Sequence, residues 1–180
     1  MNTADHSLDQ AVAGASRIQL ATRHIQSARD YTLSLIEDLE PAEWFWTPDP
    51  AVTHIAWQIG HMAFGQYGLV LFRQRGRQPG DAELMSGSFR KRFAKGSTPE
   101  TDPAYYPPLP EIRQTFDRIH ACCLKELAGM DEQGLDDPVE PPHAAFATRL
   151  GALLFAANHE MLHAGQIGLL RRLMGKPPVR

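Results

Sequence analysis

The chain of 180 residues has only two cysteines, Cys122 and Cys123, and they are neighbours in the sequence. Adjacent cysteines do not form an ordinary disulfide bridge, so the sequence argues against the disulfide framework of a small secreted domain. We therefore expect both cysteines to be small core or half-buried residues.

Long hydrophobic runs are absent as well. No window reaches about 18 uninterrupted apolar residues, the length that a membrane-spanning helix needs. The first residues are polar and lack the basic segment followed by an apolar stretch that is typical of a secretory leader. These absences predict no membrane partner and a cytoplasmic location.

No charge of one sign dominates, because the net charge is −3 and charged residues make up 22% of the chain, against 43% hydrophobic residues. This composition is typical of a globular domain, and a chain of this length buries roughly 70% of its unfolded surface. We expect one domain over residues 1–180 that needs no disulfide to hold its core together. The acidic balance and the lack of a DNA-reading module predict no nucleic-acid partner.

Apolar residues recur at helical spacing in four long segments, which cover about residues 8–39, 53–75, 110–130 and 148–174. Pro41 ends the first segment, and Thr53 is the expected N-cap of the second, which stops at Gly76. The fourth segment is apolar on more than one side, so we expect its helix to be the most buried. No segment shows strand alternation. The sequence therefore predicts an all-α fold, a four-helix bundle with long connections between the helices.

The connection over residues 77–108 is rich in proline and glycine, although residues 81–85 and 88–93 are compatible with short helices. Loops longer than about 15 residues are usually functional or mobile, so this one is a candidate lid or site wall. A basic cluster extends into it from the second helix. Its interpretations are a solvated face or a docking surface for the carboxylates of a small thiol cofactor. Its members are Arg73, Arg75, Arg77, Arg90, Lys91, Arg92 and Lys95.

His159 and His163 lie four residues apart in the fourth segment, so both imidazoles can point at one ion from the same helix face. Burying two imidazoles on an apolar helix is unfavourable unless something binds them, and a metal ion does so with short bonds. Gln166 continues the same face. The spacing therefore predicts a metal site on this helix.

A matching stripe is predicted on the second segment. His54 and His61 are seven residues apart, which places them within ~20° of the same direction on a helix. Gly65 and Gly68 continue this side and leave room beside His61. Trp57 is expected in the core or in the wall of the site. His54 would lie about 10 Å along the helix from His61, so shared coordination is not expected.

Three other histidines are interpreted as satisfied core residues, because a single histidine on a buried helix is more often that than a ligand. They are His24, His120 and His143.

The string from His159 to His163 also matches the His-Glu-x-x-His pattern of zinc peptidases. Those enzymes take a third ligand further along the chain, but Gln166 and Leu169 stand where a longer pattern needs other residues, and no acidic residue follows Glu160. We therefore predict that the protein is not a peptidase. Glu160 lies about 100° around the helix from His159, so it is either an outer-shell base or, as we favour, solvated or salt-bridged.

Two stretches, Ile55 to His61 and His159 to Ile167, resemble the signature segments of the DinB-like superfamily, and the resemblance extends over nearly the whole chain. It implies a four-helix bundle of the DinB/YfiT-like type, often a homodimer, with a metal triad of one histidine from the second helix and two from the fourth. In this chain the triad would be His61, His159 and His163. Some relatives have an acidic residue shortly after the helix-two histidine, where this chain has Gln66.

The same resemblance implies chemistry, since relatives include a mycothiol-dependent isomerase, a bacillithiol transferase and the N-terminal domain of ergothioneine sulfoxide synthase. Three neutral imidazoles leave a divalent ion with its positive charge and an open position, and they suit zinc, nickel or iron. We expect a small-molecule substrate and a low-molecular-weight thiol, in a metal-dependent transferase of the thiol S-transferase type or a hydrolase. The alternative is a non-catalytic metal-binding bundle with a structural or stress-related role. Glu160 and Gln166 are the outer-shell candidates.

Overall fold

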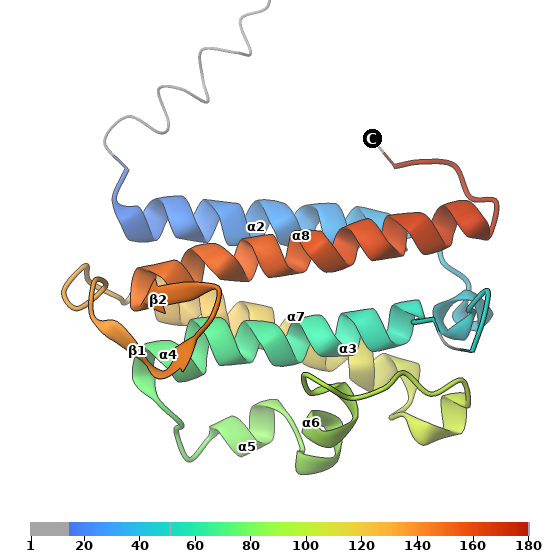
Figure 1. Ribbon diagram of the computed structural model, residues 1–180, viewed down its shortest axis with the longest axis horizontal. Helices are drawn as coiled ribbons and strands as arrows, with labels where there is room; N and C mark the ends of the chain where they lie inside the picture. The colour runs from blue at the N-terminus through green and yellow to red at the C-terminus, as the bar shows by residue number, and fades with distance from the viewer. Residues whose placement is uncertain (1–14, 51, 180) are drawn as a thin grey trace, which may run out of the picture.

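The computed structural model describes residues 15–50 and 52–179, which form a predominantly helical fold with one short β-hairpin (Figure 1). The long helices are α2 (Arg17–Ile36), α3 (Ile55–Gln66), α7 (Leu109–Ala128) and α8 (Arg149–Leu173). Helix α2 lies along α8, and α3 packs against both α7 and α8. The prediction of a mainly α-helical protein is confirmed.

The first long helix, α2, begins at a capping box. The Ser16 hydroxyl accepts a hydrogen bond from the backbone N–H of Gln19, and the Gln19 side chain accepts one from the N–H of Ser16. The buried stripe runs from Ile18 to Leu35, as the periodicity predicted. The helix ends at Ile36, earlier than expected, and the expected start at residue 8 lies outside the described residues.

The second helical segment is continuous but changes its winding. Helix α3 passes into a π-helix, η2 (Tyr67–Phe72), and then into a short turn, α4 (Arg73–Arg75). Gly76 ends the segment, as predicted, and its φ of 73° is a conformation that favours glycine.

The N-cap of α3 is His54 and not the predicted Thr53. His54 Nδ1 accepts a hydrogen bond of 3.2 Å from the backbone N–H of Trp57, because a cap needs only an acceptor at this position. His54 therefore precedes the helix, and the expectation that it shares a helical stripe with His61 was wrong.

The connection over residues 77–108 contains three short helices, α5 (Asp81–Leu84), α6 (Gly87–Phe93) and η3 (Pro103–Tyr105). Helix α6 packs against α3. Gly60 permits this close approach, because a Cβ there would lie 2.4 Å from the Phe93 ring. The connection thus covers one side of α3 (Figure 1).

A two-stranded antiparallel hairpin, β1 (Pro138–His143) and β2 (Phe146–Thr148), precedes α8. The prediction that the chain has no strand was wrong here. The prolines of β1 hide any strand pattern, but they are tolerated because each strand of a two-stranded hairpin is an edge strand. Thr148 ends the hairpin and caps α8 by accepting a hydrogen bond of 3.1 Å from the N–H of Gly151.

Helix α8 is not the most buried helix, contrary to the prediction. Only some of the apolar residues of α8 face the core, whereas most residues of α3 are buried. The others are large side chains that are 40% to 64% exposed: Leu154, Met161, Leu162, Leu169 and Leu173.

The two cysteines were expected to be core or half-buried residues, and no membrane-spanning helix was expected. Both cysteines are free, with Cys123 buried and Cys122 half-buried, as expected. Among the described residues, no helix combines the length and the apolar character needed to cross a membrane.

Candidate metal centre

Three histidines from two helices converge in the space between α3 and α8. They are His61 from α3 and His159 and His163 from α8, and one potential ligand atom from each lies within 4.8 Å of the other two. The ring centroids are 4.5 Å apart for His159 and His163, and 4.8 Å and 5.2 Å from His61 to His163 and His159. This three-histidine group could hold a metal ion, and its members are the three residues that the resemblance to the DinB-like superfamily implied.

The distance between His159 and His163 suits a shared ion. Their Nε2 atoms are 3.2 Å apart. Two imidazole nitrogens at about 2.1 Å from one zinc ion, in tetrahedral or octahedral directions, lie roughly 3.0–3.4 Å apart. The donor set therefore fits a transition-metal ion.

Outer hydrogen bonds orient two of the rings. His61 Nδ1 donates to the backbone carbonyl of Phe93 at 2.8 Å, and His163 Nδ1 donates to Oε1 of Gln58. Each bond places the ring proton on Nδ1 and leaves Nε2 with a free lone pair. Bonds of this kind fix the tautomer and the direction of metal-binding histidines.

Gln58 belongs to a short chain of polar side chains behind His163. Its Nε2 donates to Gln166 Oε1 at 2.5 Å and to Thr53 Oγ1 at 3.0 Å. Gln166, an outer-shell candidate, therefore reaches His163 through Gln58. Sequence reasoning missed Gln58, although its place three residues before His61 on a helix puts it beside that ring.

Trp57 packs on the other side of His61. The two rings are stacked, with centroids 4.7 Å apart and planes 7° from parallel. The indole Nε1 donates to Ser97 Oγ at 3.1 Å, which ties this wall to the long connection. Trp57 thus limits the rotation of His61.

Glycine at position 65 makes room for His159. A Cβ at Gly65 would lie 2.6 Å from Cε1 and 2.9 Å from Nδ1 of the His159 ring. At Gly68, by contrast, a Cβ would meet no atom of the described residues within 4 Å. The predicted room on this side of the helix is present, and at Gly65 it is filled by a ligand candidate.

Burial holds the pKa of all three rings below the ordinary value of histidine. Desolvation, followed by the charges of neighbouring histidines, lowers the pKa of His159 to about 4 and that of His163 to about 3. Desolvation also lowers the pKa of His61, against a raising contribution from its bond to Phe93. Neutral imidazole is the form that binds a metal ion, so the group is ready to bind at neutral pH.

Glu160 does not face the three-histidine group. Its carboxylate accepts hydrogen bonds from Nε and Nη2 of Arg29, at 2.8 Å and 3.4 Å. The two side chains form a buried ion pair between α8 and α2. Arg29 also donates to the carbonyl of Phe116, and its guanidinium lies 3.3 Å from the centre of that ring. Of the favoured alternatives for Glu160, the salt bridge is correct and exposure to solvent is not.

Gln66 extends the same buried network. Its Oε1 accepts from Arg29 Nη2 at 2.9 Å, and its amide lies 3.1 Å from Nδ1 of His120. Burial, followed by the charge of Arg29, lowers the pKa of His120 to about 4. His120 is half-buried and has a hydrogen-bond partner, so it is satisfied as predicted but is not fully in the core, and Gln66 serves the ion pair.

Three further histidines lie outside the group. His54 packs against Phe45 and Tyr106, with Nε2 3.1 Å from the carbonyl of Glu100. The interpretation of His24 as a core residue was wrong, because it is exposed on α2. His143 was also expected in the core, but it lies at the end of β1 on the wall of a cavity.

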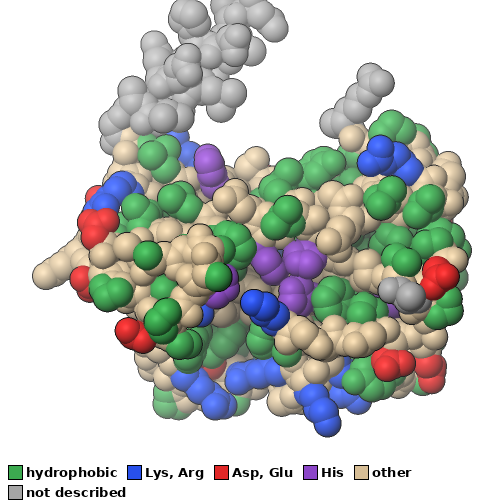
Figure 2. All heavy atoms as spheres, in the orientation of Figure 1, with side chains coloured by type: hydrophobic (Ala, Val, Ile, Leu, Met, Phe, Trp, Pro, Cys, Tyr) green, Lys and Arg blue, Asp and Glu red, His purple; other side chains and the backbone are tan. Residues whose placement is uncertain are grey.

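This cavity, which we call the histidine cavity, has a volume of about 450 Å³ and is lined by His61 and His159 among others. Its apolar wall comes from Phe64, Leu69, Phe72 and Phe155. Such a volume with a mainly apolar lining is typical of small-molecule sites. Figure 2 shows histidine side chains gathered near the middle of one face, with basic side chains beside them.

The basic cluster divides in the structure. Arg75 forms ion pairs with Asp81 and Glu126 and so serves the fold. Only Arg73 and Lys95 of the cluster line the histidine cavity. The single docking surface considered from the sequence therefore reduces to two residues.

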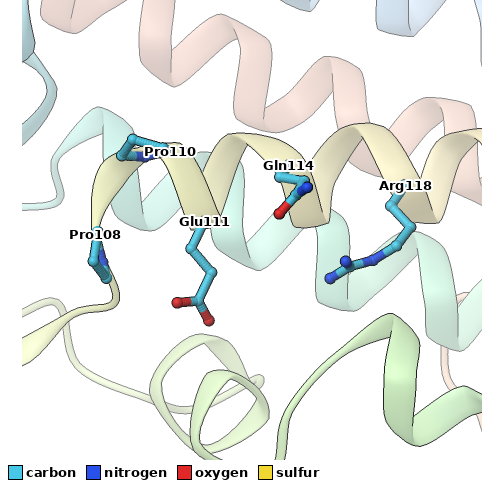
Figure 3. Close-up of a pocket in the computed structure, with 5 residues that line it drawn as sticks. All are labelled: Pro108, Pro110, Glu111, Gln114 and Arg118. Carbon is cyan, nitrogen blue, oxygen red and sulfur yellow. The ribbon is translucent and has the colours of Figure 1, made fainter.

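A second hollow, of about 710 Å³, lies along the N-terminal half of α7 (Figure 3). It is lined by Pro108, Pro110, Glu111, Gln114 and Arg118, and the Arg118 guanidinium is bonded to the Leu84 carbonyl and the Thr115 hydroxyl. The described residues that line it include no histidine or cysteine, and its two charged side chains, Glu111 and Arg118, do not form a ligand set.

These features define a class of protein, a mainly helical one with a three-histidine group between two helices that could hold a metal ion. The sequence profile of the DinB superfamily matches residues 24–167. The chain belongs to the DinB superfamily, and the resemblance seen in the sequence is confirmed.

A solved structure, described as a conserved protein from Enterococcus faecalis, is similar to this chain with a TM-score of 0.60 and 20% identity. The similarity covers 88% of this chain and 97% of the other. At this level of identity it supports the fold alone. A comparison with curated proteins found no match.

Proposed function

We propose that His61, His159 and His163 bind one divalent transition-metal ion, either zinc, nickel or iron, with an open position toward the histidine cavity. The observation that carries this proposal is the convergence of three neutral imidazoles, two of them oriented by hydrogen bonds, at a cavity that His61 and His159 line. The imidazole ligands suit all three metals, so the donor set does not select one of them.

We further propose that the protein is a metal-dependent enzyme for small molecules, either a thiol S-transferase or a hydrolase. A divalent ion held by these histidines would lower the pKa of a bound thiol or water molecule and so would supply a nucleophile at neutral pH. Residues of the chain orient the ligands and bind the substrate. Gln58 and the Phe93 carbonyl orient the rings of His163 and His61, and Trp57 packs against one face of His61. The apolar wall of the histidine cavity contacts the substrate.

The alternative is a non-catalytic metal-binding protein with a structural or stress-related role. A structural zinc site is usually closed by four protein ligands, whereas a catalytic site keeps a position free. Among the described residues, the group contains three candidate ligands and borders a cavity, which favours the enzyme.

We also propose the four-helix bundle of the DinB/YfiT-like type, as a homodimer. The four long helices and the superfamily match support the bundle. The exposed apolar side chains along α8 support the dimer, because large apolar patches on a surface usually mark an interaction site.

The experiment is metal analysis of tag-free protein, followed by a thiol-conjugation screen of the loaded protein against small electrophiles. We expect about one ion per chain and a turnover that His159→Ala removes, while the exposed-surface control His24→Ala retains both. Turnover that is unchanged in His159→Ala would refute the enzyme proposal. Stoichiometric metal without any turnover would favour the non-catalytic alternative.

A further inference from the structure

Three basic side chains meet on the histidine cavity from three separate segments of the chain. Arg73 follows the π-helix η2, Lys95 follows α6, and His143 ends β1. The three groups are neighbours because all of them line this one cavity. None of them belongs to the three-histidine group.

Arg73 is held in place but retains free donors. Its Nη1 donates to the carbonyl of Pro141 at 2.6 Å, and its guanidinium lies 5.2 Å from the centre of the Phe146 ring. No described residue accepts a bond from its Nε or Nη2. The hairpin therefore positions this guanidinium while leaving part of its donor fork available.

Lys95 and His143 also have donors to offer. Lys95 is exposed and forms no ion pair or hydrogen bond with any described residue. His143 Nδ1 accepts a bond of 3.2 Å from the backbone N–H of Ala145, so the neutral ring carries its proton on Nε2. That N–H has no acceptor among the residues that the structure describes.

The positive charge at this end of the cavity is not balanced by the protein. The described lining contains no aspartate or glutamate. Arg75, two residues after Arg73, differs in this respect, because Asp81 and Glu126 pair with it. Figure 2 likewise shows no acidic side chain beside the histidines on this face. Unpaired cations that line a cleft attract and retain anions.

We propose that Arg73, Lys95 and His143 form an anion-binding subsite, which takes the charged group of a small organic anion whose apolar part lies against Phe64 and Phe155. The subsite deepens the proposed function, on which it rests for the identity of the reacting end near His61 and His159. It defines the substrate class as amphipathic anions, and it disfavours cations and neutral apolar molecules of the same size.

The test uses metal-free protein, so that carboxylate binding to a metal ion does not contribute. Octanoate and octylamine, which share an apolar chain and differ in charge, are titrated and followed by calorimetry. We expect octanoate to bind at one site and octylamine not to bind. Lys95→Gln and Arg73→Gln should each weaken octanoate binding roughly tenfold, as expected for loss of a hydrogen bond to a charged group.

Lys91→Gln is the matched control, because Lys91 is exposed on α6 and does not line the cavity. Gly68→Leu is a second probe, since a side chain at this position has open space on the cavity side and should block octanoate. Equal binding of both ligands, no binding of octanoate, or octanoate affinity that is unchanged in both Lys95→Gln and Arg73→Gln would overturn the subsite.

The zinc stoichiometry of the wild-type protein and of these variants separates the anion-binding subsite from the proposed metal site. Loss of zinc binding with octanoate binding intact would refute the metal site and leave the subsite standing. Normal zinc uptake without charge-selective octanoate binding would refute the subsite alone. Lys95 has no partner within the described residues, so Lys95→Gln should fold normally and keeps the test valid.

Discussion

Arg29 and Glu160 form a two-point ion pair in the interior, with side chains that are 3% and 4% exposed. The Nε atom of Arg29 lies 2.8 Å from Oε1 of Glu160, and Nη2 lies 3.4 Å from Oε2. The acidic residue of the His-Glu-x-x-His string thus joins α8 to α2, and it is not directed at the histidines on either side of it in the helix.

Glu160→Gln should therefore destabilise the fold without abolishing metal uptake. Removing one partner of a buried ion pair leaves an uncompensated charge, which costs about 3–5 kcal/mol. Urea unfolding measures the loss, and metal analysis of the folded fraction measures uptake. Replacing both partners, in Arg29→Met with Glu160→Leu, should be less harmful than the single change. A catalytic base would instead give a stable protein with lost activity.

Gly65→Ala should weaken metal binding by displacing His159. The new Cβ would lie 2.6 Å from the His159 ring, so the ring has to move from its place beside His163. Gly68→Ala is the control, because its Cβ meets no atom within 4 Å. Competition with a chromophoric chelator gives the affinities. Equal affinities in the two variants would show that the position of His159 does not matter.

Gln58→Leu should lower metal affinity by about 10- to 100-fold, the usual effect of losing an outer partner of a ligating histidine. The leucine side chain has no acceptor for the Nδ1 proton of His163. Gln58→Glu keeps an acceptor there and should retain most of the affinity. The same chelator competition applies, and a Gln58→Leu variant with the affinity of the wild type would contradict the role of Gln58.

The metal-free protein should lose stability as the pH falls. The folded-state pKa values of His159 and His163, about 4 and about 3, are below the ordinary value near 6.5. The unfolded chain therefore takes up protons first, and the free energy of unfolding decreases from about pH 6.5 down to the folded-state values.

Urea unfolding at several pH values measures this dependence. His163→Gln should make it shallower, whereas His24→Gln, at an exposed position on α2, should leave it unchanged. A pH dependence that His163→Gln does not alter would show that this ring is not buried in its neutral form.

Leu162→Glu or Leu169→Glu should produce a monomer if α8 forms the proposed dimer interface. Both side chains are more than half exposed, so the change should leave the fold intact. Sedimentation velocity compares these variants with the wild type and with Gln114→Glu, an exposed control on α7. A monomeric wild-type protein would refute the dimer.

Helical periodicity predicted the long helices because their buried stripes follow the spacing that the sequence displays. The ends were predicted where a residue type has one dominant role, as with Gly76 at a positive φ. The prediction of a helix end was wrong where a second side chain could accept the same hydrogen bond. At the start of α3, the ring nitrogen of His54 is the capping acceptor in place of the expected Thr53 hydroxyl. The hairpin was missed because proline-rich β1 gives no alternation.

His159 and His163 were predictable because their spacing places both rings on one helix face, whereas His61 was implied by the resemblance to the DinB-like superfamily. Their surroundings were not, since they depend on which segments meet in space. Gln58 on α3 contacts His163 on α8, and His143 lies on the cavity wall at the end of a hairpin strand that was not predicted from the sequence. Burial on α8 was also overestimated, because the sequence does not show which apolar residues of a helix face the core and which are exposed.

The most direct test of the account is X-ray absorption spectroscopy of the protein loaded with one equivalent of zinc, which counts the imidazole ligands. The account predicts three imidazoles and one light-atom ligand from outside the protein, with the imidazole count falling to two in His61→Ala. A site with two or fewer imidazoles in the wild-type protein, or one that His61→Ala leaves unchanged, would contradict it.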